Sequence, residues 1–260
     1  KECFVNCMSL QEIELPEGLE EIGKSAFEGC SSLKRIVIPE GVRSIREKTF
    51  CECTALQEIR LPDGLELIGR SAFSECEALQ EIRLPDGLKE IGSDAFSGCR
   101  SLRQITVPVG VKCIETAVFR SCRALQEVHL PEGLEQIGMF AFEDCDTLTR
   151  IVLPASLKRL CRGAFENCTS LLEAQLPDGL EELQDDAFEY CRSLQKVTIP
   201  AQVRQIERAA FYYCQSLQEV QLPEELNEIG EDAFAHCWAL KRIVIPAGVE
   251  KVGEHAFWEC

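Results

Sequence analysis

Hydrophobic positions recur in a unit of 23 residues along the whole chain of 260 residues. Counted from a leucine such as Leu33, apolar side chains return at positions 1, 4, 6, 10, 13, 17, 18 and 21 of the unit. The cysteines at position 21 are Cys7, Cys30, Cys53, Cys76, Cys99, Cys122, Cys145, Cys168, Cys191, Cys214, Cys237 and Cys260. A spacing this regular predicts a stack of similar turns, in which each turn buries its apolar side chains against its neighbours.

Each unit also predicts its own local structure. Positions 4 to 6 alternate between inward and outward side chains, as a short strand requires, and the proline at position 7 ends that strand because it lacks an N–H donor. We expect the Ala-Phe-x-x-Cys segment to form a single helical or 3₁₀ turn, since no stretch has the length of a regular amphipathic helix. Glycines two residues after the proline, at Gly18, Gly64, Gly87 and Gly133, are expected to have positive φ. The pattern predicts one solenoid domain over residues 1–260 with about eleven repeats.

The L-x-x-I-x-L-P run, the I-G-x-x-A-F-x-x-C run and the 23-residue period resemble the BspA-like, or Treponema pallidum-type, leucine-rich repeats. The resemblance covers essentially the whole chain. It implies a right-handed coil of short parallel β-strands joined by turn or 3₁₀ segments, with the strands on the concave side. It also implies a surface or secreted protein of bacteria or protists that acts in adhesion or host-protein binding, while a cytoplasmic location stays open. We interpret the chain as a segment of a longer array or as a consensus-like sequence.

Charge narrows the range of partners. The formal net charge is −17, which argues against nucleic acid and against anionic membrane surfaces, because both attract basic proteins. No apolar run is long enough to insert into a membrane. The outward strand positions 2, 3 and 5 carry nine bases and seven acids, so we predict a mixed-charge concave sheet inside an acidic shell.

The sixteen cysteines invite a disulfide or zinc interpretation. A straight column of parallel side chains is poorly disposed for disulfides and does not converge on a tetrahedral metal site. We therefore predict buried free thiols. Cys51, in a lone Cys-Glu-Cys, is expected to point outward and to be the most reactive thiol.

No catalytic constellation is present, because His129, His236 and His255 lie in different repeats without a motif around them. We therefore predict no enzyme, no cofactor and no metal. Two sets of residues are candidates for partner binding. The first is a rim of aromatic residues near the C-terminus: Tyr190, Tyr212, Tyr213, His236, Trp238 and Trp258. The second is a run of arginines on the concave sheet: Arg35, Arg60, Arg83 and Arg103. The alternative for the aromatic residues is that they cover the next repeat or a neighbouring domain.

The leading functional prediction is a non-enzymatic protein-binding module, in which a rigid sheet loses little entropy on docking. One alternative is a structural spacer or consensus-like scaffold without a ligand, favoured by the regular period. Another is an intracellular effector or sensor platform, which would suit free thiols. Terminal turns expose strand edges and apolar columns, so end-to-end self-association is also open.

Overall fold

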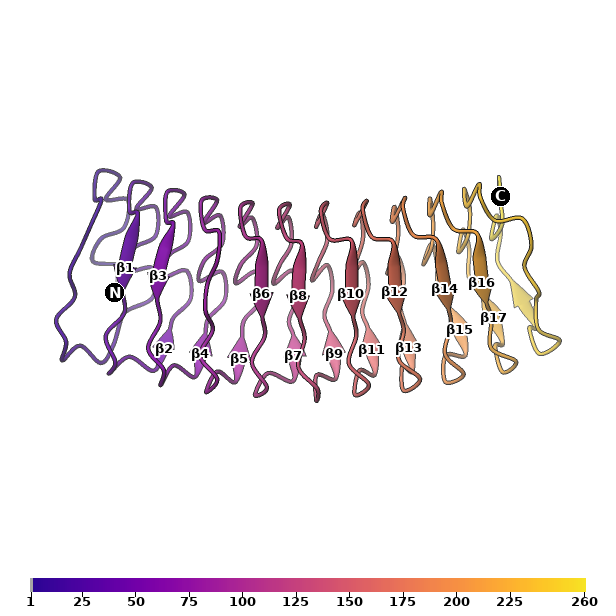
Figure 1. Cartoon of the computed structure of the whole chain (residues 1–260), viewed down its shortest axis with the longest axis horizontal. Coiled ribbons are helices and arrows are strands. Elements are labelled where there is room, and N and C mark those ends of the chain that lie inside the picture. Colours follow the sequence, from indigo (N-terminus) through magenta and orange to yellow (C-terminus); the bar gives the residue numbers. More distant parts are fainter. Residues whose placement is uncertain (1) are drawn as a thin grey trace. The chain divides into compact units, whose positions relative to one another are not determined.

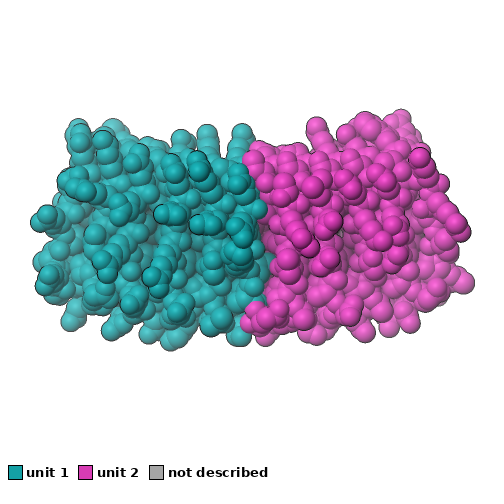
Figure 2. All heavy atoms as spheres, in the orientation of Figure 1, with its two compact units in different colours: residues 1–131 teal, residues 132–260 magenta. Residues whose placement is uncertain are grey.

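A computed structural model describes residues 2–260 as a parallel β-solenoid in which successive turns repeat every 23 residues. Contacts group the chain into two compact units, residues 1–131 (unit 1) and residues 132–260 (unit 2), which Figure 2 colours separately. Each unit consists of the same kind of turn. The prediction of a single domain over residues 1–260 stays a prediction.

Most turns carry a three-residue strand and a two-residue strand (Figure 1), but residues 81–83 form no strand. In unit 1 the three-residue strands are β1 (Arg35–Val37), β3 (Glu58–Arg60), β6 (Gln104–Thr106) and β8 (Glu127–His129). The two-residue strands of unit 1 are β2 (Ser44–Ile45), β4 (Leu67–Ile68), β5 (Glu90–Ile91) and β7 (Cys113–Ile114). In unit 2 the three-residue strands are β10 (Arg150–Val152), β12 (Glu173–Gln175), β14 (Lys196–Thr198) and β16 (Glu219–Gln221). The two-residue strands of unit 2 are β9 (Gln136–Ile137), β11 (Arg159–Leu160), β13 (Glu182–Leu183), β15 (Gln205–Ile206), β17 (Glu228–Ile229) and β18 (Lys251–Val252).

Strand pairing follows the sequence period. Paired strands are parallel, and each residue faces the one 23 positions later, as in Arg35↔Glu58 and Lys196↔Glu219. Each three-residue strand buries its middle side chain and exposes the two beside it. The predicted short parallel strands are confirmed, and residues 2–260 contain no helix, so none of them forms a segment that could cross a membrane as a helix.

The expected repeat number is slightly high, because the solenoid has about 9 turns. The repeats near both ends reach strand geometry only in part. Glu12 forms an isolated bridge with Arg35, and residues 241–245 form no strand. The same strand segment is also missing from one interior turn, at residues 81–83, so this irregularity is not confined to the ends.

The core consists of stacked columns of identical residues. In unit 1 the phenylalanine rings from Phe4 to Phe119 stack with centroids 5.1–5.7 Å apart and nearly parallel planes. Unit 2 repeats this column from Phe142 to Phe257 at 5.2–5.5 Å. Offset stacking at such distances is favourable for aromatic rings. The columns therefore tie each turn to the next.

Positive φ angles occupy positions that the sequence analysis did not predict. Gly133 has the expected positive φ of 99°, but Gly18, Gly64 and Gly87 do not. Instead, the residues five and one positions before each column cysteine are left-handed, as in Lys48 (φ 55°) and Glu52 (φ 60°). Their N–H groups donate to carbonyls of the following turn, from Lys48 to Arg70 at 2.9 Å and from Glu52 to Ser74 at 2.8 Å. These hydrogen bonds offset the left-handed strain, about 1–2 kcal/mol for a residue with a Cβ.

The cysteine column is a ladder of buried free thiols within each unit. Cys53 and Cys76 are fully buried, and Cys53 donates its S–H to the carbonyl of Phe27 at 3.1 Å. The same bond recurs through both units, as from Cys214 to the carbonyl of Phe188 at 3.2 Å. Burial raises the pKa of these thiols well above its ordinary value, so they stay protonated and unreactive.

Cys51 differs from its prediction. Its side chain is buried rather than outward, and desolvation raises its pKa to about 11. The exposed cysteines among residues 2–260 are instead Cys3, Cys7 and Cys260, with Cys113 half-buried. Thiolate is the reactive form, so Cys51 is one of the protected thiols.

We predict that a maleimide mass tag labels Cys3, Cys7 and Cys260 quickly in the native protein and Cys113 more slowly. Because the sequence holds sixteen cysteines, denaturation without reductant should allow all of them to be labelled. The measurement is the mass spectrum of the labelled protein over time. Fast native labelling of Cys51, or a denatured count well below the full number, would contradict this picture of the core.

Candidate functional site

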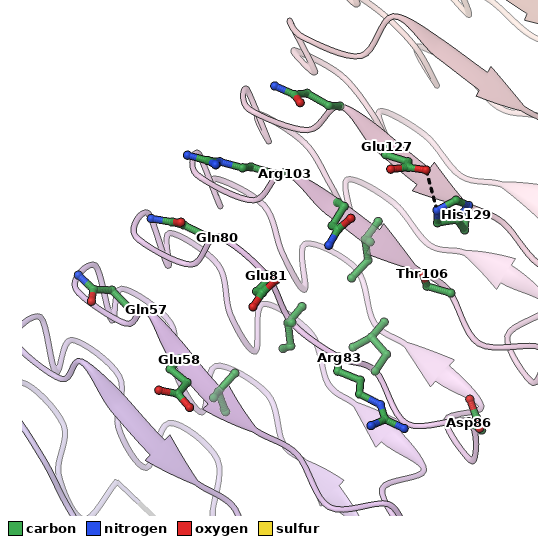
Figure 3. A pocket seen from close by; sticks show the side chains of 16 residues that line it. Gln57, Glu58, Gln80, Glu81, Arg83, Asp86, Arg103, Thr106, Glu127 and His129 are labelled. Atoms are coloured by element: carbon green, nitrogen blue, oxygen red, sulfur yellow. Dashed lines mark ion pairs between the residues drawn. The ribbon is translucent and has the colours of Figure 1, made fainter.

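The strand face of unit 1 is hollowed into a groove of about 1260 Å³ (Figure 3). We call it the unit 1 groove. Four consecutive turns supply its lining, including β3, β6 and β8. Apolar side chains such as Ile59, Ile82 and Ile105 form a buried floor, because the strand pattern turns them inward. The outward residues of the same strands stand above this floor and are exposed to solvent.

Polar side chains cross the groove in rows, because equivalent residues of successive turns lie side by side. The residues that precede each strand form an amide row of Gln57, Gln80 and Gln126, interrupted by Arg103. The next position carries Glu58, Glu81, Gln104 and Glu127. Figure 3 shows Gln57, Gln80 and Arg103 following one another along one edge. The amide N–H of Arg103 donates to the carbonyl of Gln80 at 3.0 Å, so these two turns are direct neighbours.

Most charged side chains of the unit 1 groove have no oppositely charged partner among residues 2–260. Its lining holds four acids, Glu58, Glu81, Asp86 and Glu127, and two bases, Arg83 and Arg103. The ion pair within the described lining joins His129 Nε2 to Glu127 Oε1 at 3.0 Å, with both side chains more than half exposed. With histidine neutral, four acids against two bases leave a local charge of −2. Such a surface attracts cationic groups.

The strand face of unit 2 presents a different arrangement. Its corresponding positions alternate in sign through Arg150, Glu173, Lys196 and Glu219. Neighbours of opposite charge pair across turns, from Lys196 Nζ to Glu219 Oε2 at 3.0 Å and from Arg150 Nε to Glu173 Oε2 at 3.9 Å. These charges already compensate one another, so unit 2 offers a partner fewer free groups on this face.

The four arginine candidates do not all lie at the unit 1 groove. Arg83 and Arg103 line the unit 1 groove. Arg60 lies on β3 but is not part of the lining, and Arg35 on β1 is paired with Glu12 at 2.8 Å. The structure therefore places half of the predicted run at the groove.

The aromatic candidates do come together, as a cluster on unit 2. Tyr190 contacts Tyr213 at a ring-centroid distance of 5.3 Å, and Tyr213 contacts His236 at 4.1 Å. Trp258 lies 4.9 Å from His236, and Trp238 lies 5.9 Å from Tyr213. The rings of adjacent turns thus contact one another in tilted or edge-on geometry. The two tryptophans are about half exposed, at 54% and 51%.

His236 is not an exposed member of this cluster as the sequence analysis expected. Only 5% of it is exposed, because rings from three turns close around it. Its Nδ1 lies 3.1 Å from Glu259 Oε2, although this contact is not aligned as a hydrogen bond. His236 therefore supports the surrounding rings and is not available as a contact for a partner.

A stack of carboxylates lies beside the aromatic cluster. Glu143, Glu166 and Glu189 occupy the same repeat position on three successive turns. Tyr212 occupies this position on the turn that follows. Burial raises the pKa of Glu189 to about 7, with further contributions from Asp186 and Glu166. Burial, followed by the charges of Glu143, Asp186 and Asp144, raises the pKa of Glu166.

The carboxylate of Asp186 is almost fully buried and has two basic partners. Arg162 Nε lies 2.9 Å from Asp186 Oδ2, and one guanidinium nitrogen of Arg208 lies 3.0 Å from Oδ1. Both arginines lower the pKa of Glu189, but less than burial raises it. In this region, nearby arginines neutralise only part of the negative charge of the buried carboxylates.

No group of three or more His, Cys, Asp or Glu side chains in residues 2–260 could hold a metal ion. The exposed side chains of the unit 1 groove offer hydrogen bonds and charges to a binding partner. The solenoid fold is typically a non-enzymatic scaffold.

The glutamine and glutamate rows were missed as functional residues, although a signal was present. Gln-Glu recurs at positions 2 and 3, for example at Gln57 and Glu58 and again at Gln80 and Glu81. A more useful signal is the charge at position 3 of successive turns. Arg35 is the last base at this position before the groove, and from Glu58 to Glu127 acidic and basic residues no longer alternate there.

Comparison with known proteins identifies the class. The family described as BspA type leucine rich repeat region, with six copies, matches residues 1–125, 44–161 and 135–260. The chain belongs to the family of BspA-type leucine-rich-repeat proteins, as the repeat pattern had indicated. No curated protein matches the chain.

Several solved structures are similar. A leucine-rich repeat protein from Bacteroides ovatus is 30% identical with a TM-score of 0.74, over 98% of this chain and 78% of that chain. A leucine rich cell surface protein from Faecalibacterium prausnitzii is 29% identical with a TM-score of 0.56, over 85% of this chain and 68% of that chain. The T. pallidum leucine rich repeat protein is 26% identical with a TM-score of 0.38, over 87% of this chain and 76% of that chain. Members of this family are generally protein-interaction or surface modules.

Proposed function

We propose that this chain is a non-enzymatic protein-binding module, displayed at the cell surface or secreted, that binds its partner in the unit 1 groove. The observation that carries the proposal is the set of exposed charges in this groove. Glu58, Glu81, Arg83 and Arg103 make no ion pair among residues 2–260. A partner would supply the missing opposite charges. The turns are tied together by their core columns, so docking orders little of the protein and costs little entropy.

The surface location is supported by likeness to the cell surface protein from Faecalibacterium prausnitzii. The alternatives are an intracellular platform and a spacer without a ligand. The spacer is less favoured by the structure, because a face selected only for stability could compensate its charges as Lys196 and Glu219 do.

The aromatic cluster on unit 2 is proposed as a second contact surface for a protein partner. Exposed tryptophan and tyrosine are enriched at the centres of protein interfaces. Both tryptophans of the chain, Trp238 and Trp258, lie here and are half exposed. Binding at this cluster would therefore change the intrinsic tryptophan fluorescence, whereas binding confined to the unit 1 groove would leave it unchanged.

A display experiment tests the proposed function. A random peptide library is selected on the wild-type protein, and the enriched peptides are measured against Glu81→Lys/Glu127→Lys. The double reversal changes two exposed side chains of the groove and leaves the buried floor intact. We expect enriched peptides to lose at least about tenfold in affinity for this variant, since each reversed charge turns an attraction into a repulsion. If the selected peptides bind both proteins equally, or if none is enriched, the groove is not a protein-binding site. The matched control is Glu173→Lys/Glu219→Lys on unit 2.

A further inference from the structure

We propose that the unit 1 groove binds an extended peptide segment in the polyproline II conformation that carries Lys or Arg at every third residue. The segment would cross the strands and follow the direction in which the turns stack. This inference rests on the proposed function and specifies the chemistry of its partner.

The spacing of charges in the groove supports this occupant. Glu81 and Glu127 occupy the same position two turns apart, and the turn between them contributes Arg103 and Gln104 but no acid to the lining. Neighbouring strands lie about 4.8 Å apart, so these two carboxylates recur at about 9.6 Å. A polyproline II helix rises about 3.1 Å per residue with three residues per turn, so equivalent side chains recur at about 9.3 Å. Basic residues at positions i and i+3 would therefore reach Glu81 and Glu127 together.

The amide row favours an extended segment over an α-helix. Gln57, Gln80 and Gln126 each offer two N–H donors and a carbonyl acceptor along one edge of the groove. A polyproline II segment makes no internal backbone hydrogen bonds, so its carbonyls and any N–H groups remain free for such partners. An α-helix satisfies its own backbone and would leave the amide row without a role.

Arg103 defines the register of the ligand. It interrupts the amide row between Gln80 and Gln126 and would repel a basic residue at its own turn. Its guanidinium offers only donors, which suit backbone carbonyls of the segment between two basic residues. Gln104 stands between Glu81 and Glu127 in their row, and Arg103 lies beside Gln104, so a basic residue is favoured at the turns of Glu81 and Glu127 and disfavoured at the turn between them.

The experiment uses fluorescein-labelled synthetic peptides and fluorescence anisotropy with the whole chain. The spaced peptide contains four repeats of Lys-Pro-Pro. The block peptide has the same composition, with its lysines contiguous at one end. A third peptide is helical and carries lysines seven residues apart, which places them about 10.5 Å apart on one face. We expect the spaced peptide to bind at least about fivefold more tightly than either of the others, and binding should weaken as salt is raised.

Variants locate the binding. Glu81→Gln and Glu127→Gln should each raise the Kd of the spaced peptide about threefold, as expected for exposed charge pairs. The matched control is Glu219→Gln, which removes an exposed carboxylate of the same strand position on unit 2. It should leave the Kd unchanged. Circular dichroism of each variant checks that the fold is retained.

Several outcomes would overturn the inference. Equal binding of the spaced and block peptides would show non-specific attraction to an acidic protein, and tighter binding of the helical peptide would identify a helix as the occupant. Failure of all three peptides also rejects the inference. The proposed function survives any of these results if library peptides of another pattern still depend on Glu81 and Glu127. It fails with the inference if no peptide depends on the groove.

Discussion

Phe96→Ala is expected to lower the free energy of unfolding by about 3–5 kcal/mol, the usual cost of removing a buried phenylalanine ring. The side chain of Phe96 is fully buried. Its ring stacks on Phe73 at 5.3 Å and on Phe119 at 5.7 Å, with interplanar angles of 6° and 7°. The substitution therefore removes two aromatic contacts in addition to apolar burial. The cavity can close little, because hydrogen bonds to the following turn hold the backbone of Phe96 in place.

Those hydrogen bonds show why the effect should spread beyond one turn. The N–H of Phe96 donates to the carbonyl of Val118 at 2.9 Å, and the carbonyl of Phe96 accepts the S–H of Cys122 at 3.2 Å. In a repeat protein, stability is the sum of single-repeat terms and interfaces between neighbours. A cavity at Phe96 weakens two interfaces at once and should reduce the cooperativity of unfolding.

Urea denaturation followed by far-UV circular dichroism provides the measurement. Phe4→Ala is the matched control, since Phe4 is only half-buried and its recorded ring neighbour is Phe27 at 5.1 Å. We expect a clearly smaller loss for Phe4→Ala. A loss below about 1 kcal/mol for Phe96→Ala, or equal losses for both variants, would show that the phenylalanine column does not couple the turns.

The phenylalanine and cysteine columns could be predicted from the sequence because each position repeats the same environment. Phe96 and Cys99 need only an apolar neighbour above and below, and the 23-residue period guarantees one. The left-handed conformation of Glu52 could not be predicted in this way. It depends on the hydrogen bond from Glu52 to the carbonyl of Ser74 in the next turn, and the period alone does not reveal backbone orientation. Glutamate is also a residue that rarely adopts positive φ.

The candidate site was less predictable, because pairing between charges depends on which residue the neighbouring turn presents. Lys196 finds Glu219 one turn away, whereas Glu81 faces Gln104 at the same step. The strand faces of both units carry mixed charges, so their composition alone does not distinguish them. His236 provides a second example: its burial follows from rings on three turns closing around it. The sequence analysis placed His236 on the aromatic rim and could not show that the neighbouring rings bury it.

Glu189→Gln is expected to stabilise the protein at pH 8 and to reduce the dependence of its stability on pH. Burial, Asp186 and Glu166 raise the pKa of Glu189 from 4.5 to about 7. The folded state therefore holds a proton on Glu189 that the unfolded state releases between about pH 4.5 and 7. Because the folded state binds more protons in this window, stability falls as pH rises through it and stays lower above it.

The charged form of Glu189 has two acidic neighbours and two basic ones. Asp186 and Glu166 repel it, while Arg208 and Arg162 attract it more weakly than burial opposes it. Glutamine keeps the shape of the protonated acid and removes the charge. The gain in stability over the wild type should thus be small near pH 4.5, grow through pH 7 and stay constant above about pH 8.

The difference between variant and wild type isolates the contribution of Glu189 from those of all other titratable groups. Urea midpoints measured at half-unit steps from pH 4.5 to 8.5 give this difference directly. Glu135→Gln, an exposed carboxylate of the same unit, should show no such rise. A pH-independent difference for Glu189→Gln would mean that its carboxylate is solvated in the folded protein. The expected rise would instead show that the folded protein disfavours the charged form of Glu189, mainly through burial and further through the charges of Asp186 and Glu166.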